Sequence, residues 1–420
     1  MLPNSSLLLP SGFSDAANAT PIPPSQDEWY SVPDGFEATG PGTILRIRIA
    51  QGNLTTIVHN ATAAYNILYR TTDSRHQPSW SVTTLFIPKS FHLTPSGKRA
   101  LVSYQFPYNT ADVDSSPSYG FYNELSQPVP SFNMPAATDV LGELLARGWI
   151  VNSPDFEGPN AAYGAGVQAG QATLDSLRAV TNLANMTGLG DLSIVMWGYS
   201  GGSIATEAAA ELQPQYAPRL SLSGAVIGGL ADHLPTDFDL ITKSPIAGHM
   251  VAILLGITVQ YPEVFEYVRS RLKPETADEF LGVRHMASGP RMRFFASKDI
   301  YSYFIGGRSD LQAAPLKKVY YNECRLGHYG LPEVPMFFYK AIGDEYCPIH
   351  LTDDLVNRFC AAGIEITYER NTVGNHTTEM MSAEPRVFEW LQSIFKETYH
   401  APAGGFLIRD VAVDLTGLPM

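Results

Sequence analysis

The segment from Ser193 to Glu207 constrains the fold of this chain more than any other. An uncharged run at 194–196 (Ile-Val-Met) precedes Gly198-Tyr-Ser-Gly-Gly202, and an alanine-rich run at 204–210 follows it. The apolar run is typical of a strand buried on both faces of a parallel sheet, and the alanine-rich run is compatible with a helix. The segment therefore predicts a strand, a sharp turn centred on Ser200, and a helix.

The glycines of this turn have a chemical explanation. The sequence matches the pattern G-x-S-x-G, in which a serine is lifted out of the sheet so that a base can reach it. Such a turn crowds the backbone two residues before and two residues after the serine, and Gly198 and Gly202 leave that space empty. The start of the helix also directs backbone N–H groups at developing negative charge. We interpret Ser200 as a nucleophile; the alternative is a purely structural turn.

Strands and helices alternate through most of the remaining chain. Apolar and alternating runs predict strands, and amphipathic runs predict helices. The predicted strands are 44–50, 64–71, 80–88, 100–105, 149–153, 222–229, 336–342 and 364–370, and the predicted helices are 135–147, 163–183, 351–362 and 384–398. This order indicates an α/β fold with a mainly parallel sheet that begins with antiparallel strands. Catalytic residues are then expected at the carboxyl ends of the strands.

The alternation stops between residues 231 and 322. Residues 246–259 are almost wholly apolar, with His249 as the one ionisable group, and 264–272 form an amphipathic pattern. We interpret 231–322 as an inserted helical lid or cap, although 246–259 on its own also fits a buried core helix. The predicted organisation is an extended arm at 1–30, a core at 31–230 and 323–400, the insertion at 231–322, and a tail at 401–420 that we assign to no element.

A serine nucleophile needs a base and a carboxylate that orients the base. In α/β-hydrolases these residues follow in the order Ser, Asp or Glu, then His. Asp344 comes just after a late predicted strand, and His376 lies in the loop after the next one. We predict both for the triad, with Glu345 as the alternative acid. The alternative bases are His350 and His328, and then His233; Asp353 and Asp354 are typical of the first turn of a helix instead.

The oxyanion hole is expected to use the backbone N–H of Gly201, the residue after the nucleophile. A second donor should come from a loop after an early strand, where Asn109 is the candidate; its alternative is an ordinary turn residue. Asp155 and Glu157 also follow a strand at this edge. They could be the paired carboxylates of a glycosidase, but we favour a role in shaping the floor of the site.

Charge and composition exclude several classes of function. The formal net charge is −13, which argues against nucleic-acid or anionic-membrane binding. No apolar run is long enough for a transmembrane helix. No Cys/His spacing resembles a zinc site, so we expect neither metal nor organic cofactor. Of the three cysteines, Cys347 and Cys360 could form a disulfide, and Cys324 would remain.

The cellular location is ambiguous from the sequence. The short apolar run near the N-terminus is not a clear signal peptide, so an intracellular location is an alternative. Several N-x-S/T sites favour a secreted glycoprotein whose leader is missing from this sequence. These sites are Asn4, Asn18, Asn53, Asn60, Asn185 and Asn375. We expect a monomer.

Several of these segments together resemble the fungal secretory lipase family typified by Candida antarctica lipase A. The resemblance runs in colinear order from about residue 28 to about residue 398. It rests on Tyr104-Gln105, Pro117-Ser-Tyr119, Asp155-Phe-Glu-Gly158, Gly198-Tyr-Ser-Gly-Gly202, Leu212-Gln-Pro-Gln-Tyr-Ala-Pro218, Gly224 to Gly229, Ala341-Ile-Gly-Asp-Glu345 with Pro348, and the His376 loop.

The resemblance implies an α/β-hydrolase core, a helical lid, a triad of Ser200, Asp344 and His376, and an oxyanion hole at Gly201 and Asn109. Two features depart from the type member of the family. That lipase has an acidic residue at the position of Asn109, and its tail, which covers the acyl tunnel, is longer. Specificity for long-chain triglycerides is therefore in question.

The predicted function is that of a lipase or carboxylesterase acting on apolar acyl esters through an acyl-enzyme. Alternatives within the enzyme class are an esterase that removes acetyl groups from a secondary metabolite and an acyltransferase. A lipid–water interface is a further candidate partner, besides the small-molecule ester. A catalytically silent binding protein with a hydrolase fold is the alternative from another class.

Overall fold

The computed structural model describes residues 19–52, 54–122, 134–231 and 238–416. Ten strands form one sheet in the order β1-β2-β3-β5-β4-β6-β7-β8-β9-β10. The strands are β1 Ile44–Ile49, β2 Ala61–Thr72, β3 Pro78–Pro88, β4 Arg99–Gln105, β5 Ile150–Pro154, β6 Leu192–Tyr199, β7 Gly224–Gly228, β8 Met336–Ala341, β9 Ile366–Asn371 and β10 Phe406–Val411.

The sheet changes from antiparallel to parallel at β5. Strands β1, β2, β3 and β5 pair antiparallel, whereas every pair from β5 through β4 to β10 is parallel. This confirms the prediction of a mainly parallel sheet with an antiparallel start. The parallel strands β6, β7 and β8 are buried nearly throughout, which explains their unbroken apolar sequences.

Strand β10 lies in the tail to which the sequence assigned no element. It pairs in parallel with β9 from Phe406 opposite Ile366 to Val411 opposite Asn371. Most of its side chains are exposed, so its sequence carries no alternation between buried and exposed faces. Its position at the edge of the sheet comes from backbone pairing, which the side-chain pattern does not record.

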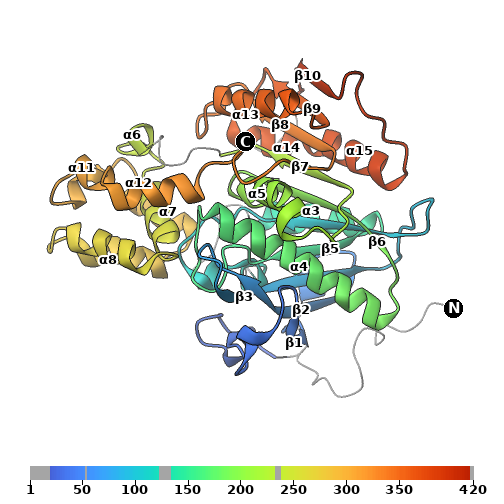
Figure 1. Ribbon diagram of the computed structural model, residues 1–420, viewed down its shortest axis with the longest axis horizontal. Helices are drawn as coiled ribbons and strands as arrows, with labels where there is room; N and C mark the ends of the chain where they lie inside the picture. The colour runs from blue at the N-terminus through green and yellow to red at the C-terminus, as the bar shows by residue number, and fades with distance from the viewer. Residues whose placement is uncertain (1–18, 53, 123–133, 232–237, 417–420) are drawn as a thin grey trace.

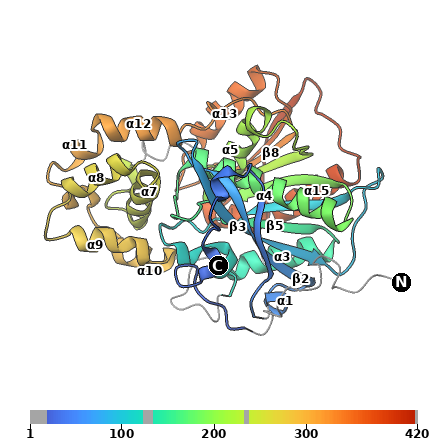
Figure 2. The ribbon, with the colours of Figure 1, turned by 60° about the horizontal axis from the view of Figure 1, so that its bottom comes forward.

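Helices cover both faces of the sheet (Figures 1 and 2). Their bounds are α1 Leu54–Ile57, α2 Pro117–Gly120, α3 Met134–Ala146, α4 Gly166–Thr187, α5 Gly201–Tyr216, α6 Phe238–Ile241, α7 Gly248–Thr258, α8 Pro262–Arg271, α9 Ala277–Leu281, α10 Ser288–Phe295, α11 Arg308–Leu311, α12 Ala314–Glu323, α13 Ile349–Ala361, α14 His376–Ser382 and α15 Glu384–Phe395. Two apolar clusters result, one joined by α4, α5 and α13 and the other by α3 and α15.

Helices α6 to α12 extend to one side of the sheet, between β7 and β8 in the chain (Figures 1 and 2). We call residues 238–323 the helical segment. Its apolar helix α7 is buried at every residue except His249. The buried residues of this segment belong to the same apolar cluster as those of α4 and α5.

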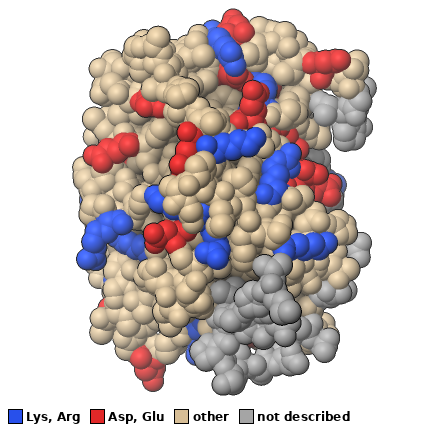
Figure 3. Space-filling view, turned by 90° about the vertical axis from the view of Figure 1, so that its right-hand side faces the viewer, with Lys and Arg blue, Asp and Glu red and all other residues tan. Residues whose placement is uncertain are grey.

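Acidic and basic side chains are interspersed on the face shown in Figure 3, which therefore carries no continuous field of one sign. This face shows no basic stripe of the kind that nucleic-acid binding needs. Within the described ranges, no helix is long and apolar enough to cross a bilayer.

The suggested disulfide between Cys347 and Cys360 is not formed. All three cysteines lie in the described part of the chain, and none of them is in a disulfide. The reason is helix geometry. Cys360 lies near the end of α13 and Cys347 just before its start. At 1.5 Å per residue the intervening helix separates them by about 16 Å, whereas a disulfide needs Cα atoms within about 7 Å.

Candidate active site

Ser200 occupies the turn between β6 and α5, with backbone angles φ 54° and ψ −123°. A non-glycine residue in this region is strained, and such strain persists only where the surroundings enforce it. The flanking glycines make the turn possible. A Cβ at Gly198 would lie 2.1 Å from the carbonyl oxygen of Gly202, and one at Gly202 would lie 1.8 Å from that of Gln105.

The structure brings Ser200, His376 and Asp344 into one hydrogen-bonded chain. His376 Nε2 lies 2.9 Å from Ser200 Oγ, and His376 Nδ1 lies 2.8 Å from Asp344 Oδ2. Asp344 follows β8, and His376 is the first residue of α14, whose N-terminus is closed by a capping box at Asn375. All three therefore lie at the carboxyl ends of parallel strands, as the chain order predicts.

The carboxylate of Asp344 is held ionised and oriented. Its Oδ1 accepts N–H bonds from Tyr346 at 3.0 Å and Cys347 at 2.9 Å, and the buried Lys340 ammonium lies 3.6 Å from Oδ2. Burial by itself would raise the pKa of Asp344. The hydrogen bond and charge of His376, with smaller contributions from Lys340 and the Cys347 N–H, hold the pKa below its usual value.

The backbone of His376 is fixed on both sides. Its N–H donates to Glu345 Oε2 at 2.9 Å, and its carbonyl accepts a hydrogen bond of 2.6 Å from the Tyr199 hydroxyl. The alternative acid, Glu345, therefore contacts the backbone of the histidine and not its ring. The sequence analysis did not identify Tyr199 and Lys340 as residues of the site. Each places a polar or charged group inside an otherwise apolar strand, and this signal was available.

The other histidine candidates lie away from this chain. His350 is exposed on α13, and His328 contacts Arg325 at 3.0 Å; neither lines the cavity at Ser200. His233 lies outside the described residues. The expectation for Asp353 and Asp354 is wrong. Helix α13 begins at Ile349, so both residues lie beyond its first turn, and Asp353 accepts a hydrogen bond from Tyr368.

Asn109 lies directly against the start of α5. Its Oδ1 would be 1.8 Å from a Cβ at Gly201, so only glycine fits there. Oδ1 is buried and has no hydrogen-bond partner among the described residues. Asn109 has a φ of 48°, a left-handed conformation that asparagine tolerates better than most residues. The loop is tied to the helical segment, because Thr110 Oγ1 lies 3.3 Å from the Met286 carbonyl.

A cavity of about 110 Å³ opens at Ser200. Its walls come from the sheet edge, from α14 and from helices α7 and α10. The lining residues are Pro107, Asn109, Tyr199, Ser200, His249, Ser288, Met292, Tyr346, His376, Thr377 and Met380. His249, Ser288 and Met292 belong to the helical segment, so this segment forms part of the wall of the site.

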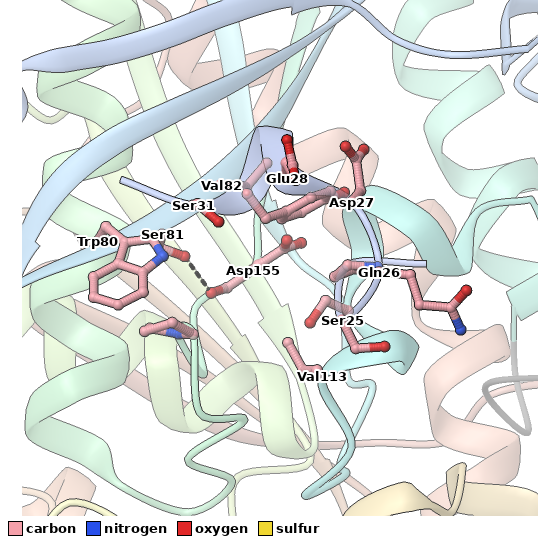
Figure 4. Close-up of a pocket in the computed structure, with 15 residues that line it drawn as sticks. Ser25, Gln26, Asp27, Glu28, Ser31, Trp80, Ser81, Val82, Val113 and Asp155 are labelled. Carbon is pink, nitrogen blue, oxygen red and sulfur yellow. Dashed lines mark hydrogen bonds between the residues drawn. The ribbon is translucent and has the colours of Figure 1, made fainter. Parts of the chain in front are cut away.

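Asp155 and Glu157 do not line the cavity at Ser200. Asp155 borders a separate cavity of about 300 Å³ beside Trp80 (Figure 4). It accepts hydrogen bonds from the backbone N–H and hydroxyl of Ser118 at 2.8 and 2.5 Å, and burial raises its pKa to about 7. Glu157 is buried without lining that second cavity. The two carboxylates therefore do not face each other across one cleft, as a glycosidase requires.

No group of His, Cys, Asp and Glu suited to a metal ion occurs among residues 19–52, 54–122, 134–231 and 238–416.

The fold, with a sharp strand-to-helix turn at Ser200 after a central parallel strand, is that of the α/β-hydrolases. Residues 125–401 match the family model described as "Secretory lipase". This chain belongs to the secretory lipase family, and it is a carboxylic ester hydrolase.

Several fungal proteins are similar over nearly the whole chain. A Stachybotrys chartarum protein named "Probable trichothecene esterase" is 47% identical over 402 residues, covering 96% of this chain and 83% of that protein. The "Trichothecene C-3 esterase" of Fusarium sporotrichioides is 41% identical and covers 96% of this chain and 91% of its own length. The "Lipase A" of Arthroderma benhamiae is 34% identical, with 90% and 80% covered.

The solved structure of Candida antarctica lipase A in its closed state has the same fold. The TM-score is 0.82 at 24% identity, and the match covers 96% of this chain and 92% of that one.

Proposed function

We propose that this chain is a serine esterase in which Ser200 is the nucleophile, His376 the general base and acid, and Asp344 the orienting carboxylate. The observation that carries the proposal is the hydrogen-bonded chain from Asp344 through His376 to Ser200. As Ser200 Oγ attacks the ester carbonyl, its proton passes to His376 Nε2. Collapse of the tetrahedral intermediate breaks the bond to the alcohol oxygen, which receives that proton and leaves.

The acyl-enzyme is then hydrolysed by the same groups. His376 takes a proton from water, the hydroxide attacks the acyl carbon, and the proton returns to Ser200 as the carboxylic acid departs. Asp344 stays ionised throughout and stabilises the imidazolium, in agreement with the lowered pKa of its carboxyl group.

The oxyanion of each tetrahedral intermediate would be stabilised by the N–H of Gly201 and the side chain of Asn109. The Asn109 amide lies against Gly201, and its buried Oδ1 position has no partner among the described side chains and backbone groups. Rotation of the amide by 180° places its NH₂ group at that position, where it can donate. Such a preorganised donor stabilises charge that develops only in the transition state.

The preferred substrate is a short-chain acyl ester of a small alcohol, such as a trichothecene acylated at C-3. The cavity at Ser200, about 110 Å³, has room for a short acyl group but not for a whole trichothecene, whose alcohol part would extend beyond it, because sites that enclose larger ligands are typically roughly 300–1,000 Å³. Besides Ser200, His376 and the two tyrosines, the lining carries the polar side chains of Asn109, His249, Ser288 and Thr377. The relatives at 47% and 41% identity are both named trichothecene esterases.

A second candidate function is that of a lipase acting on longer apolar acyl chains. The family description and the relatives named lipases favour it. The helical segment also exposes apolar side chains that suit a lipid–water interface, among them Leu240, Phe294 and Ile305, at 66%, 42% and 57% exposure. Under this reading, helices α6 to α12 act as a lid within residues 231–322, between the core parts 31–230 and 323–400.

A chain-length series separates these two functions. The purified protein would be given p-nitrophenyl acetate, butyrate and palmitate, and a trichothecene acetylated at C-3, with released acid measured in each case. The short-chain proposal predicts the highest kcat/KM for acetyl esters. A maximum at palmitate would favour the lipase, and transfer of the acyl group to added alcohol in place of hydrolysis would identify an acyltransferase.

Secretion, glycosylation and a monomeric state are further proposals. Family membership supports secretion. Of the described sequons, Asn185 and Asn375 are exposed, whereas the Asn60 amide donates to the Gly142 carbonyl at 3.1 Å. Enzymatic deglycosylation of protein recovered from a fungal culture medium, followed by size-exclusion chromatography, tests all three.

A further inference from the structure

His249 is a polar group in an apolar helix that borders the proposed nucleophile. Every other residue of α7 is buried, whereas the half-buried ring of His249 lines the cavity together with Ser200 and His376. A polar ring in an apolar wall is costly unless its nitrogens have partners, so the partner of each nitrogen needs an explanation.

The ring of His249 is held by the core. Its Nδ1 lies 3.4 Å from the Tyr163 hydroxyl, and its ring contacts those of Tyr163 and Tyr346 at centroid distances of 6.2 and 6.1 Å. Tyr163 itself packs against Gly201, where an added Cβ would be 3.3 Å from Cε2. The orientation of His249 is therefore coupled to the same turn that carries Ser200.

The protonation of this pair allows the tautomer in which Nε2 carries the ring hydrogen and Nδ1 accepts from the Tyr163 hydroxyl. Burial, with the charges of Arg291 and His376, lowers the pKa of His249 to about 3, so its ring is neutral at pH 7. Burial raises the pKa of Tyr163, which keeps its hydroxyl protonated. The hydroxyl can then donate to Nδ1, which places the ring hydrogen on Nε2. No described residue forms a hydrogen bond with Nε2, so this N–H is left for a ligand in the cavity.

We propose that His249 is a specificity-determining residue that donates a hydrogen bond from Nε2 to a second oxygen of the substrate, outside the ester that is cleaved. The inference rests on the proposed function. A fixed donor in a small cavity favours a substrate that carries an acceptor and disfavours one that leaves the donor unpaired. The ligand class is therefore an oxygenated small-molecule ester, as opposed to a hydrocarbon ester of the same size.

The test compares matched ester pairs on the purified protein. Cyclohexyl acetate is paired with tetrahydropyran-4-yl acetate and with 2-hydroxycyclohexyl acetate, and p-nitrophenyl butyrate with p-nitrophenyl methoxyacetate. For each pair, kcat/KM of the oxygenated ester is divided by kcat/KM of its partner. The readout is this ratio for the variant divided by the same ratio for wild type, so that the intrinsic reactivity of the two esters cancels. We expect His249→Phe to lower this ratio about 3- to 10-fold for at least one pair, the range of a single hydrogen bond. Turnover of the hydrocarbon partner is the reference for each pair and should fall less than that of the oxygenated partner.

Two further variants keep the result interpretable. His249→Gln retains a donor and should recover part of the preference. His350→Phe, on the exposed side of α13, should leave every ratio unchanged. Thermal unfolding of each variant shows whether it folds. If His249→Phe does not fold, the test is a partial fall of the ratio in His249→Gln relative to wild type, and an unchanged ratio would contradict the proposal.

The proposal is overturned if wild type prefers no oxygenated partner, or if the His249 variants lower both members of a pair equally. In either case, retained turnover of p-nitrophenyl acetate would leave the proposed function intact. A wild-type protein that cleaves no ester would overturn both.

Discussion

The parallel half of the sheet and the helical segment contribute different kinds of residue to the cavity at Ser200. The sheet contributes Ser200, Asp344 and His376, each within a few residues of a strand end and each fixed by backbone constraints. The helical segment contributes His249, Ser288 and Met292, from the N-terminal parts of α7 and α10. Under the proposed function, the sheet supplies the reacting groups and the helical segment supplies the groups that select among esters.

The largest expected effect tests the sheet side of this comparison. Replacing Ser200 by alanine removes the proposed nucleophile, and we expect kcat on p-nitrophenyl acetate to fall about 10⁵- to 10⁶-fold. Labelling by a fluorophosphonate should be lost at the same time. His350→Leu, which changes the alternative base, serves as the control and should keep wild-type turnover. Full turnover by the alanine variant would remove Ser200 from the mechanism.

Asp344→Asn should have the next largest effect. The amide can no longer stabilise the imidazolium and favours the wrong tautomer of His376, so we expect kcat to fall about 10⁴-fold. Steady-state kinetics measure the loss. The control is Asp353→Asn, whose carboxylate binds Tyr368 away from the site and should change kcat less than twofold. Equal losses in the two variants would contradict the assignment of the acid.

Asn109→Ala tests the loop that joins the two regions. Loss of one oxyanion donor should lower kcat about 10²- to 10³-fold with little change in KM, because the interaction forms mainly in the transition state. The effect should be the same for oxygenated and hydrocarbon esters, unlike that of His249. A rise in KM with unchanged kcat would show that Asn109 only binds substrate.

The smallest effect concerns the buried junction between the regions. Glu323 ends α12, and its carboxylate accepts hydrogen bonds from the Tyr261 hydroxyl in the helical segment and from the Val167 N–H of α4, the latter at 3.2 Å. Burial raises the pKa of Glu323 to about 7. Because the folded-state pKa lies above the unfolded one, its contribution to stability is complete below about pH 4 and is lost as pH rises through about 7.

We therefore expect Glu323→Gln to flatten the fall in the free energy of unfolding between pH 5 and 7. The difference from wild type should be at most about 1.4 kcal/mol per pH unit, the limit for one proton. Denaturant unfolding at several pH values measures it, with the exposed Glu389→Gln as control. An unchanged slope would place the pH sensitivity at other buried carboxyl groups, such as Asp155.

Local patterns in the sequence predicted most of the sheet and selected the three side chains that lie in contact. Gly198, Ser200 and Gly202 follow from the space available at a strand-to-helix turn. Asp344 and His376 follow from chain order, because parallel strands end at one edge. Their catalytic roles remain predictions, as does that of Asn109.

Other features depend on contacts between distant segments and could not be predicted. The hydrogen bond from the Tyr199 hydroxyl to the His376 carbonyl joins residues 177 positions apart. Strand β10 is defined only by its pairing with β9. The suggested Cys347–Cys360 disulfide, by contrast, already conflicted with the predicted helix at 351–362, which nearly coincides with α13 and keeps the two cysteines apart.

The sequence by itself determined the turn at Ser200 and the parallel sheet, because these follow from backbone sterics and from hydrophobic periodicity over short distances. It also determined the chain order of Ser200, Asp344 and His376 relative to the strands. Only the tertiary structure decided the size of the cavity and the orientation and protonation of His249. Those properties depend on which groups surround a side chain in space, and His249 faces Tyr163, Tyr346 and Arg291 from three separate segments.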